Sequence, residues 1–351
     1  MFENYNLNRN ETLLNEVLIV DGQPGSGKTL FTQIFGSLER VEHFNYSTEI
    51  ENMCALIHLG KIERNATKSM LKIQLDQLIY ETMMSRRSNF RYSDLSSVFK
   101  SPKFIDYIKR LLSKGDEIIP NIINTRKPIL QILTHNLLPY SEIIFQTFKE
   151  KLKYVEIIRH PLYMIIQQTL NQQNFYNNSD KSRQFHLCFE KDNNEFFYWN
   201  IDYIDEFVNC LPVERAILEI KYFFEQSNLF KSKNKKFLKQ LITIPFEQFA
   251  LKPYPFLNNL NLFIGTKNSK NTNKILLKNK IPRKKISDSI SLDIYKRCGW
   301  EPPVKNFNEK EELKHRRNFI IKNNARKKYI DIIDKLSYEY EDKYMKSILN
   351  L

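Results

Sequence analysis

The stretch VLIVDGQPGSGKTLF, residues 17–31, determines which fold to expect. It begins with an apolar run typical of a buried strand and ends in apolar residues that favour a helix. Between these runs, Gly22 to Thr29 satisfy the pattern G-x-x-x-x-G-K-[ST]. The glycines let backbone N–H groups surround a phosphate, the helix N-terminus adds positive charge, and Lys28 reaches a phosphate oxygen. The sequence therefore predicts a phosphate-binding loop between a strand and a helix.

Further strands and helices follow the loop. The helix after the loop is expected to run to about Arg40, and a polar helical region follows it. Strand-like apolar runs lie at 128–133, 154–159 and 241–246. A helix between the first two makes a βαβ unit, in which the strands are parallel. We predict an α/β fold of the P-loop type, with three α/β/α layers and a central parallel sheet.

Three later segments are expected to add to this core. Two aromatic-rich runs around the turn KDNN, within 183–200, predict a β-hairpin. The segment 266–285 is basic without an acid, and we predict a loop there. A long charged helix is expected from about Asn308 onward. We predict a single domain over 12–300, with 172–205 inserted near the acceptor site, and a helical extension over 301–351.

The composition narrows the class of protein. A formal net charge of +14 over 351 residues accompanies a Lys-, Asn- and Ile-rich composition, so we interpret it as background charge and do not expect nucleic acid as a partner. The four cysteines lack metal-binding spacing. No apolar run is long enough to span a bilayer, and the N-terminus is too polar for a signal peptide. We expect a soluble cytoplasmic protein.

The residues at the strand ends bear on the reaction. A P-loop kinase also needs Mg²⁺, usually held by an acid at the end of a neighbouring strand. Here two strands instead run into His135 and Arg159, and only Asp21 and Glu247 could supply an acid. The sequence therefore favours a metal-independent reaction. An ATP- and Mg²⁺-dependent phosphotransferase remains an alternative, as does a non-catalytic nucleotide- or nucleic-acid-binding protein that uses the basic residues 267–285.

The loop resembles that of sulfotransferases that use 3′-phosphoadenosine 5′-phosphosulfate, whose fold is related to the P-loop kinases. In PGSGKTLF the family's loop is matched by Pro24, Ser26, Gly27 and Thr29, while Gly25 and Lys28 stand where the family has lysine and threonine. The resemblance implies that this loop holds the 5′-phosphosulfate. The full set of expected donor-binding residues is Gly22, Pro24, Gly25, Ser26, Gly27, Lys28, Thr29, Arg159, Gln167 and Phe246.

Three downstream segments extend the resemblance. VEIIRHPLYMIIQQTL is similar to the family's strand–Arg–Pro–helix segment, which implies that Arg159 binds the 3′-phosphate, with Gln167 in place of a serine. LTHNLLP resembles the segment whose histidine removes the acceptor proton, which is His135 here, with Glu156 as a rival base. Phe246 stands where the family has a tyrosine, which implies a place near the adenine of the donor. The alternative is that Phe246 is a core aromatic residue. The basic run 282–285 is either a further phosphate contact or a solvated loop.

The resemblance implies a reaction. The acceptor hydroxyl attacks sulfur in line, Lys28 stabilises the leaving phosphate, His135 takes the proton, and no metal is needed. We expect a saccharide or other polar hydroxyl compound as acceptor, because the helical segments flanking the loop are polar. The C-terminal helix could also join two copies of the chain into a homo-oligomer.

Overall fold

The sheet at the centre of the molecule carries the loop. The structure is a computed structural model that describes residues 7–9, 11–176, 184–286, 293–302 and 307–349. Its five-stranded sheet is parallel throughout, in the order β2-β3-β1-β4-β7. The strands are β1 (Glu16–Asp21), β2 (Asn45–Tyr46), β3 (Ile129–Leu133), β4 (Leu152–Ile158) and β7 (Leu241–Pro245). The prediction of a parallel α/β sheet is confirmed.

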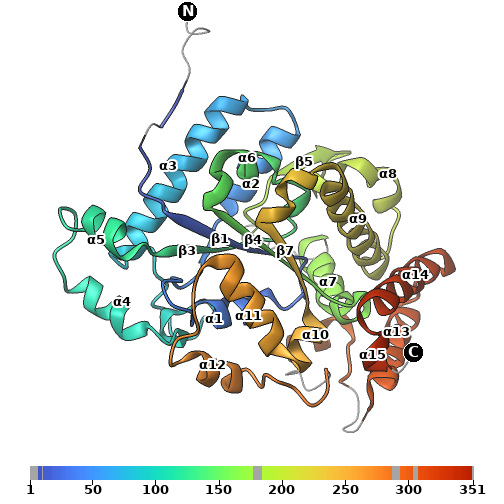
Figure 1. The fold of residues 1–351 in the computed structure, drawn as a ribbon. Coiled ribbons are helices and arrows are strands. Elements are labelled where there is room, and N and C mark those ends of the chain that lie inside the picture. Colours follow the sequence, from blue (N-terminus) through green and yellow to red (C-terminus); the bar gives the residue numbers. More distant parts are fainter. Residues whose placement is uncertain (1–6, 10, 177–183, 287–292, 303–306, 350–351) are drawn as a thin grey trace, which may run out of the picture.

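Helices cover both faces of this sheet (Figure 1). The α-helices from the loop to the hairpin are α1 (Lys28–Phe35), α2 (Thr48–His58), α3 (Arg64–Met83), α4 (Phe104–Leu111), α5 (Ile119–Arg126), α6 (Glu142–Phe148) and α7 (Pro161–Tyr176). Those after the hairpin are α8 (Ile204–Phe207), α9 (Pro212–Lys233), α10 (Phe246–Leu251), α11 (Pro253–Ile264), α12 (Thr272–Lys278), α13 (Glu309–Lys322), α14 (Lys327–Tyr344) and α15 (Lys346–Leu349).

Alternate residues of β1 enter two different cores, which explains the three layers. Val17 and Ile19 pack in one cluster with residues of α2, α3, α6 and α9. Leu18 and Val20 pack in another with residues of α1, α10, α11 and α12. Because successive side chains of a strand point to opposite faces, an apolar run without alternation suits a strand buried on both sides.

The structure corrects three details of the expected elements. Helix α1 ends at Phe35 rather than near Arg40. The expected loop over 266–285 contains α12, because Ile275 and Leu276 are buried against the sheet-facing core while the lysines stay outside. The predicted long C-terminal helix is divided into α13 and α14, and Asn324 between them has a positive φ of 57° that breaks the helix.

The predicted hairpin is present. Strands β5 (Cys188–Lys191) and β6 (Asn194–Phe197) are antiparallel. Asp192 and Asn193, the two turn residues, both have positive φ, as a tight hairpin turn requires.

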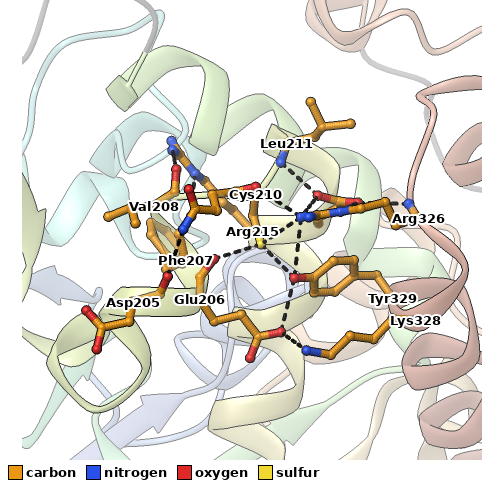
Figure 2. Close-up of polar contacts among 12 residues, drawn as sticks. Asp205, Glu206, Phe207, Val208, Cys210, Leu211, Arg215, Arg326, Lys328 and Tyr329 are labelled. Carbon is orange, nitrogen blue, oxygen red and sulfur yellow. Dashed lines mark hydrogen bonds and ion pairs between the residues drawn. The ribbon is translucent and has the colours of Figure 1, made fainter.

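The C-terminal helices pack on the chain itself. Arg326, just before α14, donates to Glu214 at the start of α9 at 2.7 and 2.8 Å. Figure 2 shows Arg326 and Tyr329 facing Glu206 and Cys210. Tyr329 bonds to Glu206 and accepts from the thiol of Cys210. Buried residues of α14 belong to the same apolar cluster as residues of α7 and α9. This face of α14 is therefore occupied within one chain, and oligomer formation stays a prediction. No helix in the described ranges is both long and apolar enough to cross a bilayer.

A buried carboxylate at the end of β1 bonds to β4 and to the segment after β3. Asp21, the last residue of β1, is 1% exposed. It accepts hydrogen bonds from the hydroxyls of Thr134 and Tyr154 at 3.0 and 2.8 Å. It also accepts from the backbone N–H groups of Leu137 and Leu138. Asp21 therefore joins β1 to β4 and to the segment after β3, directly beside the loop.

We expect Asp21→Ala to lower the free energy of unfolding by about 3 kcal/mol or more, because it leaves several buried donors without an acceptor. Urea unfolding followed by circular dichroism measures this. Asp331→Ala, at an exposed position with only a 4.0 Å ion pair, is the matched control and should change stability little. Equal effects of the two substitutions would contradict the role of Asp21.

Candidate active site

The loop between β1 and α1 forms a cradle of backbone groups. Gly27 has φ of 93°, and a Cβ there would lie 2.5 Å from the ring of Phe246, so only glycine fits. Lys28 lies over the loop and donates hydrogen bonds to the carbonyls of Gly22 and Gln23 at 2.6 and 2.9 Å. Ser26 Oγ is buried and has no hydrogen-bond partner among the described residues. This arrangement has the donors that a phosphate or sulfate group requires.

Lys28 is a cation held out of water. Burial lowers its pKa to about 8, although Asp21 and Glu51 act in the opposite direction. An anion in the loop would favour the protonated form, so binding of an anion and protonation of Lys28 are coupled.

Arg159 joins the end of β4 to the loop. Its Nη1 donates to the carbonyl of Gly25 at 2.8 Å, and its guanidinium lies 4.2 Å from the ring centre of Phe246. Glu247 lies 3.9 Å from Arg159 Nε, and this buried nitrogen has no hydrogen-bond partner among the described residues. Burial lowers the pKa of Arg159, but an arginine stays charged. The structure thus places Arg159 at the loop, and its predicted role in binding a phosphate stays a prediction.

Two further arginines lie around the same rings. The guanidinium of Arg283 is 5.3 Å from the centre of Phe246, and that of Arg316 is 4.5 Å from the centre of Tyr163, which Arg159 also approaches. Arg283 is half-buried, so a solvated basic loop is the wrong description for this residue. Arg316 is paired with Glu312 of the same helix. Together they make a second positively charged region beside the loop.

Gln167 and Phe246 border this region. The side-chain oxygen of Gln167 accepts from the hydroxyl of Tyr295 at 3.3 Å, which leaves its amide N–H groups as donors. Phe246 is only 3% exposed and packs in the core, so the core-aromatic alternative fits it. It supports Gly27 and Arg159 rather than offering an open face to adenine.

His135 follows β3 on the other side of the loop. Its ring is stacked on that of Tyr46, with the ring centres 6.1 Å apart. Burial and the charge of Lys28 lower the pKa of His135, against the opposite effect of Glu51. A neutral imidazole beside the loop is able to accept a proton.

The acids near the loop are already engaged. Asp21 is saturated by strand-end donors. Glu247 accepts from the backbone N–H of His160 and from the hydroxyl of Tyr340 at 2.6 Å. Glu156 is bound by Lys231 and Thr243 at 2.8 and 2.7 Å, so it is not a free rival to His135 as base.

Two residues next to His135, Glu51 and His186, belong to no motif of the sequence. Glu51, on α2, approaches His135 and His186, and the three form the one His/Cys/Asp/Glu group with metal-like spacing within the described ranges. The aromatic hairpin contributes less to the site than expected, because Phe197, Tyr198 and Trp199 are buried in the core. Its contribution comes from His186, in the segment that leads into β5.

Comparison with known proteins gives a likeness of fold. No protein-family profile and no curated protein sequence matches the chain. A sulfotransferase domain from the curacin biosynthetic pathway is similar at 12% identity and a TM-score of 0.42, over 89% of this chain and 99% of that one. A sulfotransferase from Mycobacterium avium is similar at 9% identity and a TM-score of 0.41, over 95% and 78%. The sulfotransferase domain of a Synechococcus olefin synthase is similar at 11% identity and a TM-score of 0.38, over 89% and 97%. All three of these structures are of sulfotransferases.

Gly27→Ala should abolish binding of inorganic pyrophosphate to the loop and lower the melting temperature, because the new methyl group collides with Phe246. Gly60→Ala is the matched control, since Gly60 also has a positive φ but nothing lies within 4 Å of a Cβ there. The control should show only the backbone cost of roughly 1 kcal/mol. Calorimetric titration and thermal unfolding measure both effects. Pyrophosphate binding by Gly27→Ala at the wild-type affinity would contradict the cradle.

Proposed function

We propose that this protein is a sulfotransferase that moves a sulfuryl group from 3′-phosphoadenosine 5′-phosphosulfate to an acceptor hydroxyl. The observation that carries the proposal is the presence of two cationic regions side by side. One is the loop with Lys28, and the other is Arg159 with Arg283 and Arg316. A nucleotide with phosphates on both its 5′ and 3′ oxygens suits two such regions. The phosphates of ATP form a single chain and suit the loop alone.

The residues divide the chemical work. When bound, the donor supplies the sulfuryl group, whose bond to the 5′-phosphate oxygen breaks as the acceptor oxygen bonds to sulfur. Lys28 and the N–H groups of Gly22–Thr29 stabilise charge on the departing phosphate. His135 accepts the acceptor proton on Nε2, the ring nitrogen that is not directed at Glu51. Arg159 and Gln167 hold the 3′-phosphate, and Phe246 supports Arg159.

The proposed reaction assigns no role to a metal ion. The two acids that a metal-dependent alternative would use, Asp21 and Glu247, are buried and hydrogen-bonded to strand and helix groups. Freeing either carboxylate for Mg²⁺ would leave its donors unsatisfied in the interior.

For the acceptor we propose a polar hydroxyl compound, with saccharides as the first class to test. A cavity beside the loop is lined by the amides of Gln23, Asn136 and Asn228 and by Phe223 and Phe224. Amide groups pair with hydroxyls, and aromatic faces pack against sugar rings. The buried side-chain oxygen of Asn136 has no hydrogen-bond partner among the described residues and is able to accept from a hydroxyl.

Calorimetric titration with adenosine 3′,5′-bisphosphate and with ATP, each with Mg²⁺ and with a chelator, tests the function. We expect tight binding of the bisphosphate without metal. Arg159→Ala should weaken it at least tenfold, since it removes a charged hydrogen bond to phosphate. The control is Arg40→Ala. Arg40 is a half-buried arginine that forms an ion pair with Glu16 away from the loop, and this variant should bind the bisphosphate as the wild type does. Binding of ATP alone, and only with Mg²⁺, would instead support a phosphotransferase.

The affinity for the bisphosphate should fall as the pH rises through about 8, because free Lys28 then loses its proton. The bound anion raises the pKa of Lys28, so binding near this pH should take up a proton. Titrations in buffers of different ionisation enthalpy measure this uptake, and Lys28→Met should abolish it. Proton-neutral binding at pH 8 by the wild type would show that Lys28 does not face the anion.

A further inference from the structure

We propose that Glu51 is a positioning residue that fixes the orientation and protonation of His135, with His186 as its second partner. The inference rests on the proposed function, in which His135 is the base. Glu51 lies on α2, outside every motif of the sequence, and it is 2% exposed.

The two oxygens of Glu51 have separate partners. Oε1 accepts the backbone N–H of His135 at 2.7 Å and lies 3.4 Å from Nδ1 of the same residue. Oε2 lies 2.7 Å from Nε2 of His186. A carboxylate against Nδ1 keeps the proton on that nitrogen and leaves the lone pair of Nε2 free to accept a proton.

The charges around His135 explain why a carboxylate is needed there. Lys28, His186 and burial all disfavour a protonated His135, while Glu51 is the group that favours it, and Tyr46 covers one face of the ring. Burial acts to raise the pKa of Glu51, but the hydrogen bonds and charges of the two histidines together outweigh it and lower this pKa to about 2. Glu51 therefore stays ionised at neutral pH and stabilises the imidazolium that forms when His135 takes a proton.

The segment that carries His186 is fixed to the same helix as Glu51. The side chain of Asn52 accepts from the backbone N–H of Leu187 at 3.0 Å and donates to the carbonyl of Phe185 at 2.8 Å. Because Asn52 follows Glu51 directly, one stretch of α2 holds both the base and the start of the hairpin. Phe185 itself is 67% exposed beside this site.

The same three side chains are chemically able to bind a divalent cation, with two imidazoles and a carboxylate as ligands. The distances favour hydrogen bonds instead. The 2.7 Å between Glu51 and His186 is an ordinary hydrogen bond, and Oε1 already accepts a backbone N–H.

The decisive experiment compares wild type with Glu51→Gln by NMR of protein labelled with ¹⁵N-histidine. The chain has six histidines, so substitution of each assigns its signals. In the wild type, the neutral form of the His135 imidazole should carry its proton on Nδ1. Glu51→Gln should lower the pKa of His135 and mix its tautomers. The control Glu225→Gln, which removes an exposed partner of Lys221, should change neither signal.

Turnover gives a second readout on the same variants. With 3′-phosphoadenosine 5′-phosphosulfate as donor and water as the sulfuryl acceptor, Glu51→Gln should lower the rate of bisphosphate release about tenfold or more, with an unchanged KM for the donor. The acidic limb of its pH profile should shift to lower pH. His186→Asn, which keeps a hydrogen-bond donor, should show a smaller effect. Matching melting temperatures would exclude a general loss of folding as the cause.

The outcomes separate this inference from the proposed function. No binding of adenosine bisphosphate by the wild type would overturn the function, whatever the histidine signals show. Unchanged His135 signals in a Glu51→Gln protein that binds the bisphosphate would overturn the role of Glu51 alone. Stoichiometric binding of Zn²⁺ by the wild type, lost in His186→Asn and accompanied by shifts of both histidines, would replace it with a metal site.

Discussion

The arrangement of the site depends on the buried carboxylate of Asp21. Through its bonds to Thr134, Leu137, Leu138 and Tyr154, it holds together the chain after β1, the chain after β3 and the middle of β4. Gly22 follows Asp21, and His135 follows Thr134. The loop and the proposed base are therefore set beside each other by one group that does no chemistry itself. A buried carboxylate is stable in this position only because its oxygens are fully hydrogen-bonded.

A second buried carboxylate supports the other side of the loop. Glu247 accepts hydrogen bonds from the hydroxyl of Tyr340 on α14 and from the backbone N–H of His160. It also lies beside Arg159. His160 is itself bonded to Glu341 of α14. The C-terminal helix thus contributes to the position of the arginine that contacts the loop. Changes far along the chain are expected to affect the site through this connection.

The sequence was informative where local patterns determine the structure. An apolar run without alternation, followed by Gly22–Thr29, predicted a buried parallel strand and its loop. Arg159, after β4, lies at that loop in the structure. The C-terminal edge of a parallel sheet collects strand ends, which is why motifs far apart in sequence converge there. The assigned roles of these residues stay proposals, to be tested by binding.

Long-range pairing was not accessible to the same reasoning. Glu51 and His186 are separated by 135 residues and belong to no motif, so only the packing of α2 shows that they meet. The acids Asp21 and Glu247 have the right positions for metal ligands, and sequence alone does not reveal that their oxygens are taken. Likewise, Arg283 belongs to a run of basic residues that looks solvated until the core under α12 places it over Phe246.

The free site is electrostatically unfavourable, and this property bears on its use. Lys28 and Arg159 are buried cations whose pKa values are lowered, and their carboxylate neighbours serve other groups as well. Lys28 donates hydrogen bonds to the carbonyls of Gly22 and Gln23, and Arg159 donates one to the carbonyl of Gly25. An anionic ligand offers each cation a stronger partner than a carbonyl. Because the folded chain already carries the cost of desolvating these groups, the ligand gains the full interaction without first ordering them. The lowered pKa values of the free cations and the proposed affinity for a doubly phosphorylated nucleotide would thus have the same cause, the burial of Lys28 and Arg159.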